Sequence, residues 1–244
     1  MSLLQGSTPS PVKPLPYPLT NKKSSVFTVP IEQTKNMKAI VITDQNFGKT
    51  LPLTKSIPHC LKNLMTIIAR ENINCIFIIG DIVNFDDLNI EKAQETLLEV
   101  FKQFEMIPLP IYIMGGENNR RLLFDLNYSI PFSNIKVVYD FLIRIHNPNP
   151  VLDTPPNFYL THDGKNPLKL KPDEVESYAI ELKRAFKDEI ANEDFLIIGH
   201  CQAYYLNESA RVATIKEFSP DNHRNGYAII EMTEQGLKLN IVGK

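Results

Sequence analysis

Five short segments carry the polar side chains with which this sequence could do chemistry. Each segment follows an apolar run and contributes carboxylate, amide or imidazole groups. Short apolar runs predict buried strands, and ligands bind where the carboxyl ends of neighbouring strands meet. Oxygen and imidazole groups that converge at such a point can hold one or two divalent metals. The segments are residues 43–46, 80–81, 116–119, 161–163 and 199–202.

The elements that must position these segments alternate along the chain. The apolar runs predict strands, and periodic apolar residues between them predict amphipathic helices. After Gly199 the pattern changes to short strands with a last turn at residues 234–236. The expected fold is therefore α/β, a sandwich of two mixed sheets flanked by helices. The expected strands are 39–42, 75–79, 111–114, 158–160, 195–198, 211–216, 227–232 and 237–242, and the expected helices are 57–70, 90–105 and 174–190.

Size and composition narrow the function classes. The 244 residues suit one α/β domain, and a net charge of −2 gives no electrostatic case for nucleic acid or an anionic membrane. No apolar run approaches the roughly 20 residues that span a bilayer. Three cysteines without zinc spacing indicate reduced thiols, read as small buried hydrophobes, in an intracellular, cytoplasmic protein. No GxGxxG or P-loop pattern indicates a nucleotide-binding domain.

The first 36 residues differ from the rest of the chain. Six of the 18 prolines fall between Pro9 and Pro30. Such a segment cannot be helical and is expected to run as an extended arm, with a disordered tail as the alternative. We expect residues 1–36 to form this arm and residues 37–244 to form the domain. Extended arms commonly bind along another protein, so a protein partner is expected here.

Taken in order, the five segments resemble those of the calcineurin-like metallophosphoesterase superfamily, including its class III cyclic nucleotide phosphodiesterases. The family segments are D-x-H, G-D, G-N-H-[DE], a lone H and G-H-x-H, each after a strand. The resemblance begins near Met37 and reaches the C-terminus. No single segment is specific, whereas five in register are hard to obtain by chance. The resemblance implies a site for one or two divalent metals, with Mn, Fe, Zn and Mg as candidates, or none if the site is a relic.

The resemblance also divides the expected ligands into two sets. One set keeps groups that bind metals well, with a carboxylate where the family has asparagine. In the other set both family imidazoles are replaced by amides, whose neutral oxygens bind transition metals more weakly. The first set is Asp81, Glu117, His162 and His200, and the second is Asp44, Asn46, Asp81 and Gln202. The chain thus resembles a protein with one intact and one weakened metal site that share Asp81.

Further expectations concern catalysis. Asn118 stands where the family has a histidine that protonates the leaving group, and asparagine cannot deliver a proton at neutral pH. In such enzymes that role contributes about 10²–10⁴-fold to the rate. Arg120 and Arg121 are the candidates for holding a substrate phosphate, with an exposed pair at a helix start as the alternative.

Two functions follow from the resemblance and stay open at this point. One is a divergent phosphoesterase that hydrolyses a phosphodiester or phosphomonoester with a weakened two-metal site. The other is a catalytically inactive subunit or adaptor in a protein complex, which the proline-rich arm favours.

Overall fold

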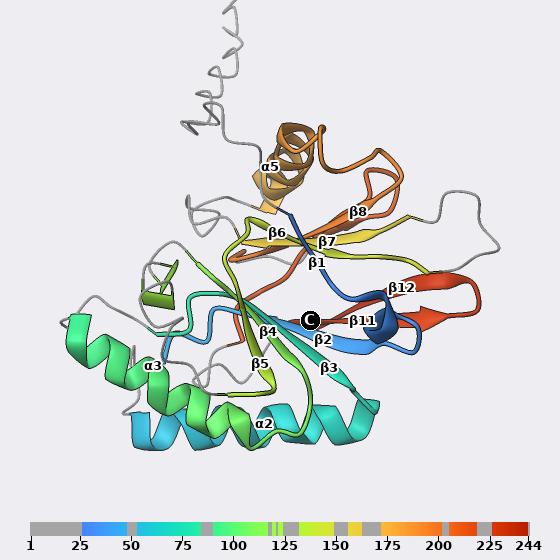
Figure 1. Cartoon of the computed structure of the whole chain (residues 1–244). Helices are drawn as coiled ribbons and strands as arrows, with labels where there is room; N and C mark the ends of the chain where they lie inside the picture. Colours follow the sequence, from blue (N-terminus) through green and yellow to red (C-terminus); the bar gives the residue numbers. More distant parts are fainter. Residues whose placement is uncertain are drawn as a thin grey trace, which may run out of the picture.

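The computed structural model describes residues 26–47, 53–83, 90–116, 119–120, 122–123, 132–148, 156–162, 172–201, 205–218 and 226–243. Two six-stranded sheets pack face to face, with helices on their outer faces (Figure 1). Both sheets are mixed. The α/β fold class predicted from the sequence is therefore confirmed.

Sheet B contains the strands that lead to the first three polar segments. Strands β2 to β5 are parallel neighbours, so their carboxyl ends lie at one edge, and the antiparallel pair β11 and β12 extends the sheet on the β2 side. The bounds are β2 Lys38–Thr43, β3 Cys75–Gly80, β4 Ile111–Gly115, β5 Ile135–Val138, β11 Tyr227–Thr233 and β12 Gly236–Val242.

Sheet A contains the strands that lead to the two histidine segments. Strands β7 and β8 run parallel, and their register pairs His162 with Gly199, so both polar segments leave the sheet side by side. The strand order is β1-β6-β7-β8-β10-β9. The bounds are β1 Val26–Thr28, β6 Leu142–Ile145, β7 Phe158–His162, β8 Phe195–Gly199, β9 Tyr205–Asn207 and β10 Val212–Thr214.

The helices cover the two outer faces. Helices α2 (Leu53–Glu71) and α3 (Ile90–Glu105) pack on sheet B, and α5 (Pro172–Ala185) packs on sheet A (Figure 1). The single-turn helix α1 (Ile31–Thr34) follows β1. Apolar layers therefore lie on both faces of each sheet. In β3, for example, Ile76 and Ile78 face the helices, whereas Phe77 and Ile79 face the other sheet. A strand buried on both faces needs a continuous apolar run, which is why these strands are visible in the sequence.

Element bounds differ from the prediction at several ends. Helix α3 has the expected bounds, whereas α2 starts at Leu53 instead of residue 57. Pro58 lies inside α2, so this proline does not mark the helix start that it indicated. Helix α5 ends at Ala185, and the chain continues in turns to residue 190. The strands β1, β5, β6 and β9 were not predicted, because each has only three or four residues and gives no clear periodic signal.

Part of the expected N-terminal arm lies within the described residues. Val26–Thr28 pairs in parallel with β6 as strand β1, and Phe27 packs against the apolar layer between the sheets. Residues 1–25 lie outside the described residues, so the arm and its partner remain predictions.

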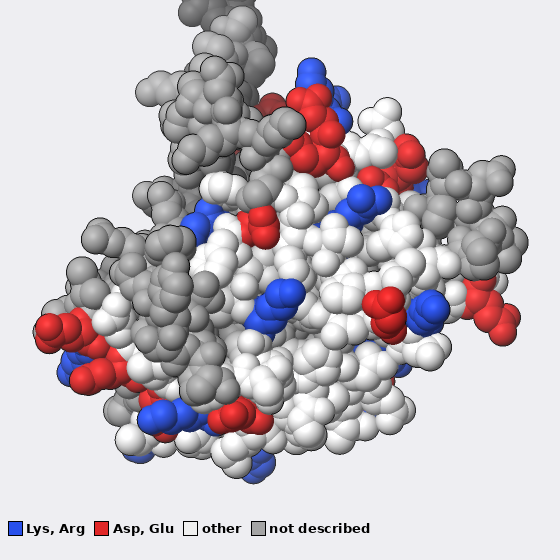
Figure 2. Space-filling model, viewed as in Figure 1, with Lys and Arg blue, Asp and Glu red and all other residues white. Residues whose placement is uncertain are grey.

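The surface charges and the cysteines agree with the expectations drawn from the composition. On the face shown in Figure 2, Lys and Arg side chains are interspersed with Asp and Glu side chains. Cys60, Cys75 and Cys201 are free and buried, as predicted, and burial raises the pKa of the Cys60 and Cys75 thiols to about 12. Among the described helices, none is long and apolar enough to cross a membrane.

Candidate metal site

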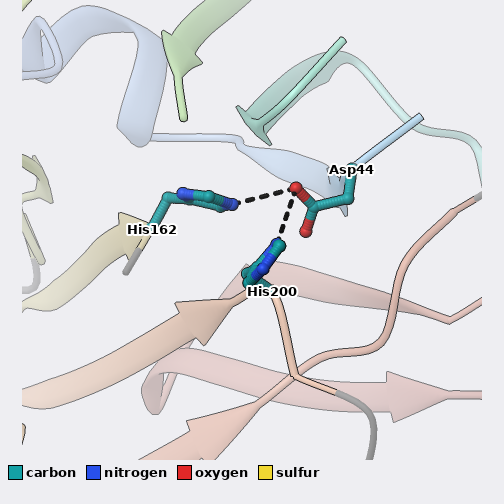
Figure 3. Close-up of side chains that lie close together, drawn as sticks. All are labelled: Asp44, His162 and His200. Atoms are coloured by element: carbon teal, nitrogen blue, oxygen red, sulfur yellow. Dashed lines mark hydrogen bonds and ion pairs between the residues drawn. The ribbon is translucent and has the colours of Figure 1, made fainter. Parts of the chain in front are cut away.

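Three side chains predicted as metal ligands converge between the two sheets. Asp44 follows β2, His162 ends β7 and His200 follows β8 (Figure 3). His162 Nε2 lies 2.9 Å from Asp44 Oδ1, and His200 Nδ1 lies 3.2 Å from the same oxygen. The two imidazole rings meet edge to face at 4.8 Å between centroids. One carboxylate oxygen is thus shared by two imidazoles from the other sheet.

The spacing of these three groups fits a divalent metal. Their ligand atoms all lie within 4.8 Å of one another. Ligands bound at about 2.1 Å to one ion lie roughly 3.0–3.4 Å apart in octahedral or tetrahedral geometry. The contacts of Asp44 Oδ1 with the two imidazoles are of this size, so small shifts suffice to admit an ion. A carboxylate with two imidazoles is a donor set that suits zinc, iron or manganese.

Burial and charge set the electrostatics of Asp44. Its side chain is 2% exposed, and burial by itself opposes ionisation. The charge and hydrogen bond of His162, together with those of His200, outweigh burial and hold the pKa of Asp44 far below its usual range. The Thr43 hydroxyl donates to Asp44 Oδ2 at 2.7 Å, and the Asp81 N–H donates to Oδ1 at 3.0 Å. Asp44 is therefore an oriented, ionised carboxylate at neutral pH, as a metal ligand must be.

His162 keeps one ring nitrogen unsatisfied. Its side chain is 1% exposed, and its Nδ1 is buried without a hydrogen-bond partner among the described residues. Gln45, fully buried beside Asp44, likewise lacks partners for both amide atoms within that part of the chain. Buried polar atoms without partners cost free energy, so their presence beside the cluster favours a site that binds something polar.

Glycines at the strand ends create the space for these contacts. A Cβ at Gly80 would lie 2.5 Å from Asp44 Oδ1, and one at Gly116 would lie 2.4 Å from Asp81 Oδ1. His162 would collide with both, at 2.5 Å and 2.8 Å from its ring carbons. Gly80 also has φ 108°, which favours glycine. The two glycines therefore let three predicted ligands approach one another.

Backbone strain is concentrated at the same place. Asp44, Asn46 and His200 have positive φ angles of 51°, 48° and 66°. Residues other than glycine rarely adopt this left-handed conformation, and such strain is typical of functional sites. Among the described residues, the other two examples, Asn72 and Arg211, lie in turns away from the cluster.

Asp81 lies beside the cluster and is held by Asn119. The Asn119 N–H donates to Asp81 Oδ1 at 3.3 Å. The fully buried Asn119 side chain accepts from the N–H groups of Ile82 and Val83 at 3.0 and 2.9 Å, and donates to the Val83 carbonyl at 2.9 Å. Asn119 therefore fixes the loop that carries Asp81. No role was predicted for Asn119, although its place in the segment that matches G-N-H-[DE] was a signal.

Asn46 is turned toward the backbone. Its amide nitrogen donates to the Asp44 carbonyl at 3.1 Å, and its N–H donates to the Asp81 carbonyl at 3.2 Å. The loops after β2 and β3 thus run side by side, and Asn46 joins them at the edge of the cluster.

Only some members of the two predicted ligand sets lie within the described residues. The structure joins Asp44, from the set expected to be weakened, to His162 and His200 of the set expected to be intact, with Asp81 adjacent. Glu117, Asn118, Arg121 and Gln202 lie outside the described residues, so their roles remain predictions. Arg120 lies one turn beyond Gly116, and its guanidinium lies over the ring of Phe141 at 4.1 Å. Sequence reasoning did not single out Phe141.

Comparisons with known proteins find likeness in fold. No protein-family model matches the chain, and no curated protein matches it. A dimetal phosphatase from Danio rerio is 10% identical, with a TM-score of 0.47 over 86% of this chain and 99% of that one. GAP50, the anchor in the inner membrane complex of Plasmodium, is 14% identical, with a TM-score of 0.48 over 85% and 84%. The nuclease MPE from Pseudomonas putida is 14% identical, with a TM-score of 0.40 over 79% and 84%.

At these identities the likeness concerns the fold alone. What each of these proteins binds or does belongs to that protein.

Proposed function

We propose that this protein is a divergent metal-dependent phosphoesterase of the calcineurin-like class. The observation that carries the proposal is the convergence of Asp44, His162 and His200 from three separate strand ends. Each of them was expected as a ligand from the order of the motifs. Chance convergence of three flagged residues in a buried, strained cluster is improbable, whereas a metal site explains both the burial and the strain.

In this proposal Asp44, His162 and His200 hold a divalent metal, and Asp81, which Asn119 holds beside the cluster, is the carboxylate proposed to bind a second. Such a metal supplies an activated water and positive charge for the phosphate oxygens. The chain itself orients Asp44 through the Thr43 hydroxyl and fixes Asp81 through Asn119. Arg120 lies on the adjacent turn and is the residue proposed to bind the phosphate.

Amides at three family positions limit the proposed activity. Asn46, Asn118 and Gln202 replace imidazoles, so one metal is held weakly and the leaving group receives no proton from position 118. Esters whose leaving groups are stable as anions should be hydrolysed best, because they need no proton donor.

The second candidate function is that of a non-catalytic subunit. It is favoured by the amides at positions 46, 118 and 202, which are poorer metal ligands and proton donors than the family imidazoles. In this case any metal at Asp44 and the two histidines is structural, and the proline-rich arm predicted for residues 1–36 is proposed to bind a protein partner.

The first experiment is metal analysis of protein saturated with Mn²⁺ and then desalted. Wild type should retain one or two equivalents, and Asp44→Asn and Asp81→Asn should each retain less. Asp188→Asn changes an exposed aspartate on another part of the chain and serves as the matched control. Retention that is equal in all four proteins, or absent in wild type, contradicts the proposed site.

Hydrolysis separates the two candidates. Mn²⁺-loaded wild type is incubated with bis(4-nitrophenyl) phosphate and with 4-nitrophenyl phosphate. Release of nitrophenol that Asp44→Asn abolishes supports the phosphoesterase. Retained metal without release of nitrophenol from either compound favours the non-catalytic subunit.

A further inference from the structure

A cation–aromatic pair joins the two sheets next to the candidate metal site. The Arg120 guanidinium lies 4.1 Å from the centroid of the Phe141 ring. Arg120 follows β4 of sheet B, whereas Phe141 directly precedes β6 of sheet A. The pair therefore spans the gap between the sheets, as the contacts of Asp44 with His162 and His200 also do.

Backbone contacts place both members beside the site. The Arg120 N–H donates to the Gly116 carbonyl at 2.9 Å, and Gly116 lies against Asp81 and His162. The Thr161 hydroxyl, one residue before His162, donates to the Phe141 carbonyl at 2.9 Å. The antiparallel register of β6 and β7 pairs Ile143 with Leu160. Extended by two residues, the same register sets Phe141 opposite His162. Phe141 and Arg120 thus border the site on its Asp81 and His162 side.

The Phe141 residue is 47% exposed, although most large apolar residues in the described part of the chain are buried. Arg120 lies over one face of its ring, so a ligand can reach the ring only at the other face or the rim. A guanidinium stacked on a ring donates hydrogen bonds in its own plane, past the rim, where planar phosphate recognition takes place. A phosphate held there brings its ester group next to the exposed aromatic surface.

We propose that Phe141 is a specificity-determining residue of this site, which favours phosphoesters whose organic group is a flat aromatic ring, such as a phenyl ring or a nucleobase. The inference rests on the proposed function, because it takes the metal and Arg120 to hold the phosphate. An aromatic ring gains offset or edge contacts with Phe141 that a saturated ring of similar size does not, and these contribute beyond simple burial. Phe141 also positions Arg120 through the cation–aromatic contact.

Two phosphonates of similar size, which the enzyme cannot cleave, test the preference. Binding of phenylphosphonate and cyclohexylphosphonate to Mn²⁺-loaded protein is measured by titration calorimetry. Wild type should bind phenylphosphonate about threefold to tenfold more tightly. In Phe141→Leu the two dissociation constants should become equal, whereas Phe141→Tyr should keep the preference.

Arg120→Gln provides the contrasting variant. It should weaken the binding of both phosphonates by a similar factor, about tenfold or more, because it removes the group proposed to hold the phosphonate oxygens. Phe141→Leu should instead act mainly on the phenyl compound. An unchanged Mn²⁺ content in each variant shows that the metal site is intact.

The outcomes separate this inference from the proposed function. Wild type that retains Mn²⁺ and binds both phosphonates equally overturns the role of Phe141 and leaves the phosphoesterase proposal standing. A preference for phenylphosphonate that survives Phe141→Leu also overturns it. Wild type that retains no Mn²⁺ and binds neither phosphonate contradicts the proposed function itself.

Discussion

Two buried aspartates lie at opposite ends of the parallel strands β7 and β8, and they differ in how they are satisfied. Asp194 directly precedes β8, at the amino ends of the two strands. Asp44 contacts the histidines at their carboxyl ends. Both side chains belong to residues that are nearly inaccessible to water, at 4% and 1% exposure.

Asp194 is satisfied by the chain around it. Its Oδ1 accepts from the backbone and side-chain N–H groups of Asn157 at 2.8 and 3.1 Å, and its Oδ2 accepts from the Ala191 N–H at 3.0 Å. Lys183 donates to the carbonyls of Asn192 and Asp194 nearby. These partners tie the start of β8 to the segment before β7 and to α5. The arrangement needs no ligand and serves the fold.

Asp44 accepts hydrogen bonds from the Thr43 hydroxyl and the Asp81 N–H, and its Oδ1 also contacts two imidazoles that a metal could bind. Its neighbourhood contains three left-handed residues, and His162 Nδ1 lacks a partner within the described residues. Burial of a carboxylate therefore does not by itself indicate a metal site. The indication is burial together with partners that can bind a metal, backbone strain and buried polar atoms without hydrogen-bond partners.

The largest expected effect concerns Asp194, the aspartate that serves the fold. Asp194→Ala leaves three donor N–H groups without an acceptor, so the free energy of unfolding should fall by about 3–5 kcal/mol. Urea denaturation measures this, and Asp188→Ala, an exposed neighbour, should change it by less than about 0.5 kcal/mol. A small effect of Asp194→Ala would show that the two aspartates are not as different as their contacts indicate.

A slightly smaller effect is expected for Asn119, which fixes the loop that carries Asp81. Asn119→Ala leaves the Ile82 and Val83 N–H groups unpaired and should lower the free energy of unfolding by about 2–4 kcal/mol. Unlike Asp194→Ala, it should also weaken Mn²⁺ binding, because it loosens the loop that carries Asp81. Elemental analysis alongside denaturation checks both. Unaltered Mn²⁺ content would place Asn119 with the purely structural residues.

Metal addition should separate the two aspartates directly. At a Mn²⁺ concentration about 100 times the dissociation constant, wild type should gain about 2.7 kcal/mol in unfolding free energy. Asp44→Asn should gain little, whereas Asp194→Asn should gain as much as wild type, whatever its starting stability. The measurement is thermal or urea unfolding with and without Mn²⁺, and an equal gain in Asp44→Asn would rule out Asp44 as a ligand.

The smallest expected effect concerns acid. Because the folded state lowers the pKa of Asp44, its contribution to stability is present above the unfolded value near 4 and is lost as the pH falls below it. Metal-free wild type should therefore lose about 1 kcal/mol more than Asp44→Asn between pH 4 and pH 3. Urea denaturation across this range checks the difference. An equal loss of unfolding free energy in the two proteins between pH 4 and pH 3 would mean that the imidazoles do not stabilise the carboxylate.

Much of the fold could be predicted from the chain because its central strands are buried on both faces. Such strands require continuous apolar runs, which β2, β3, β4, β7 and β8 all have. Helix α3 was predicted with its observed bounds because its apolar residues recur at helical spacing. The short edge strands β1 and β9 escaped prediction, because three residues with partial exposure give no periodic signal.

The candidate site was predictable in its residue types but not in its contacts. Asp44, His162 and His200 were flagged by their places after apolar runs, yet the motifs assigned them to different ligand sets. Asn119 and Phe141 could not be assigned roles, because one acts through hydrogen bonds to a neighbouring loop and the other through a stack with a residue of the other sheet.

By itself, then, the sequence determined the central strands, the helices α2, α3 and α5 and the chemistry available at the strand ends, because these follow from local patterns of apolar and polar residues. Tertiary structure alone decided that Asp44 of one sheet meets His162 and His200 of the other. Residues that are 118 or more positions apart come within hydrogen-bonding distance only when the two sheets pack face to face. The left-handed backbone of Asp44 and His200 is tolerated because that packing, and not local preference, fixes the strand ends.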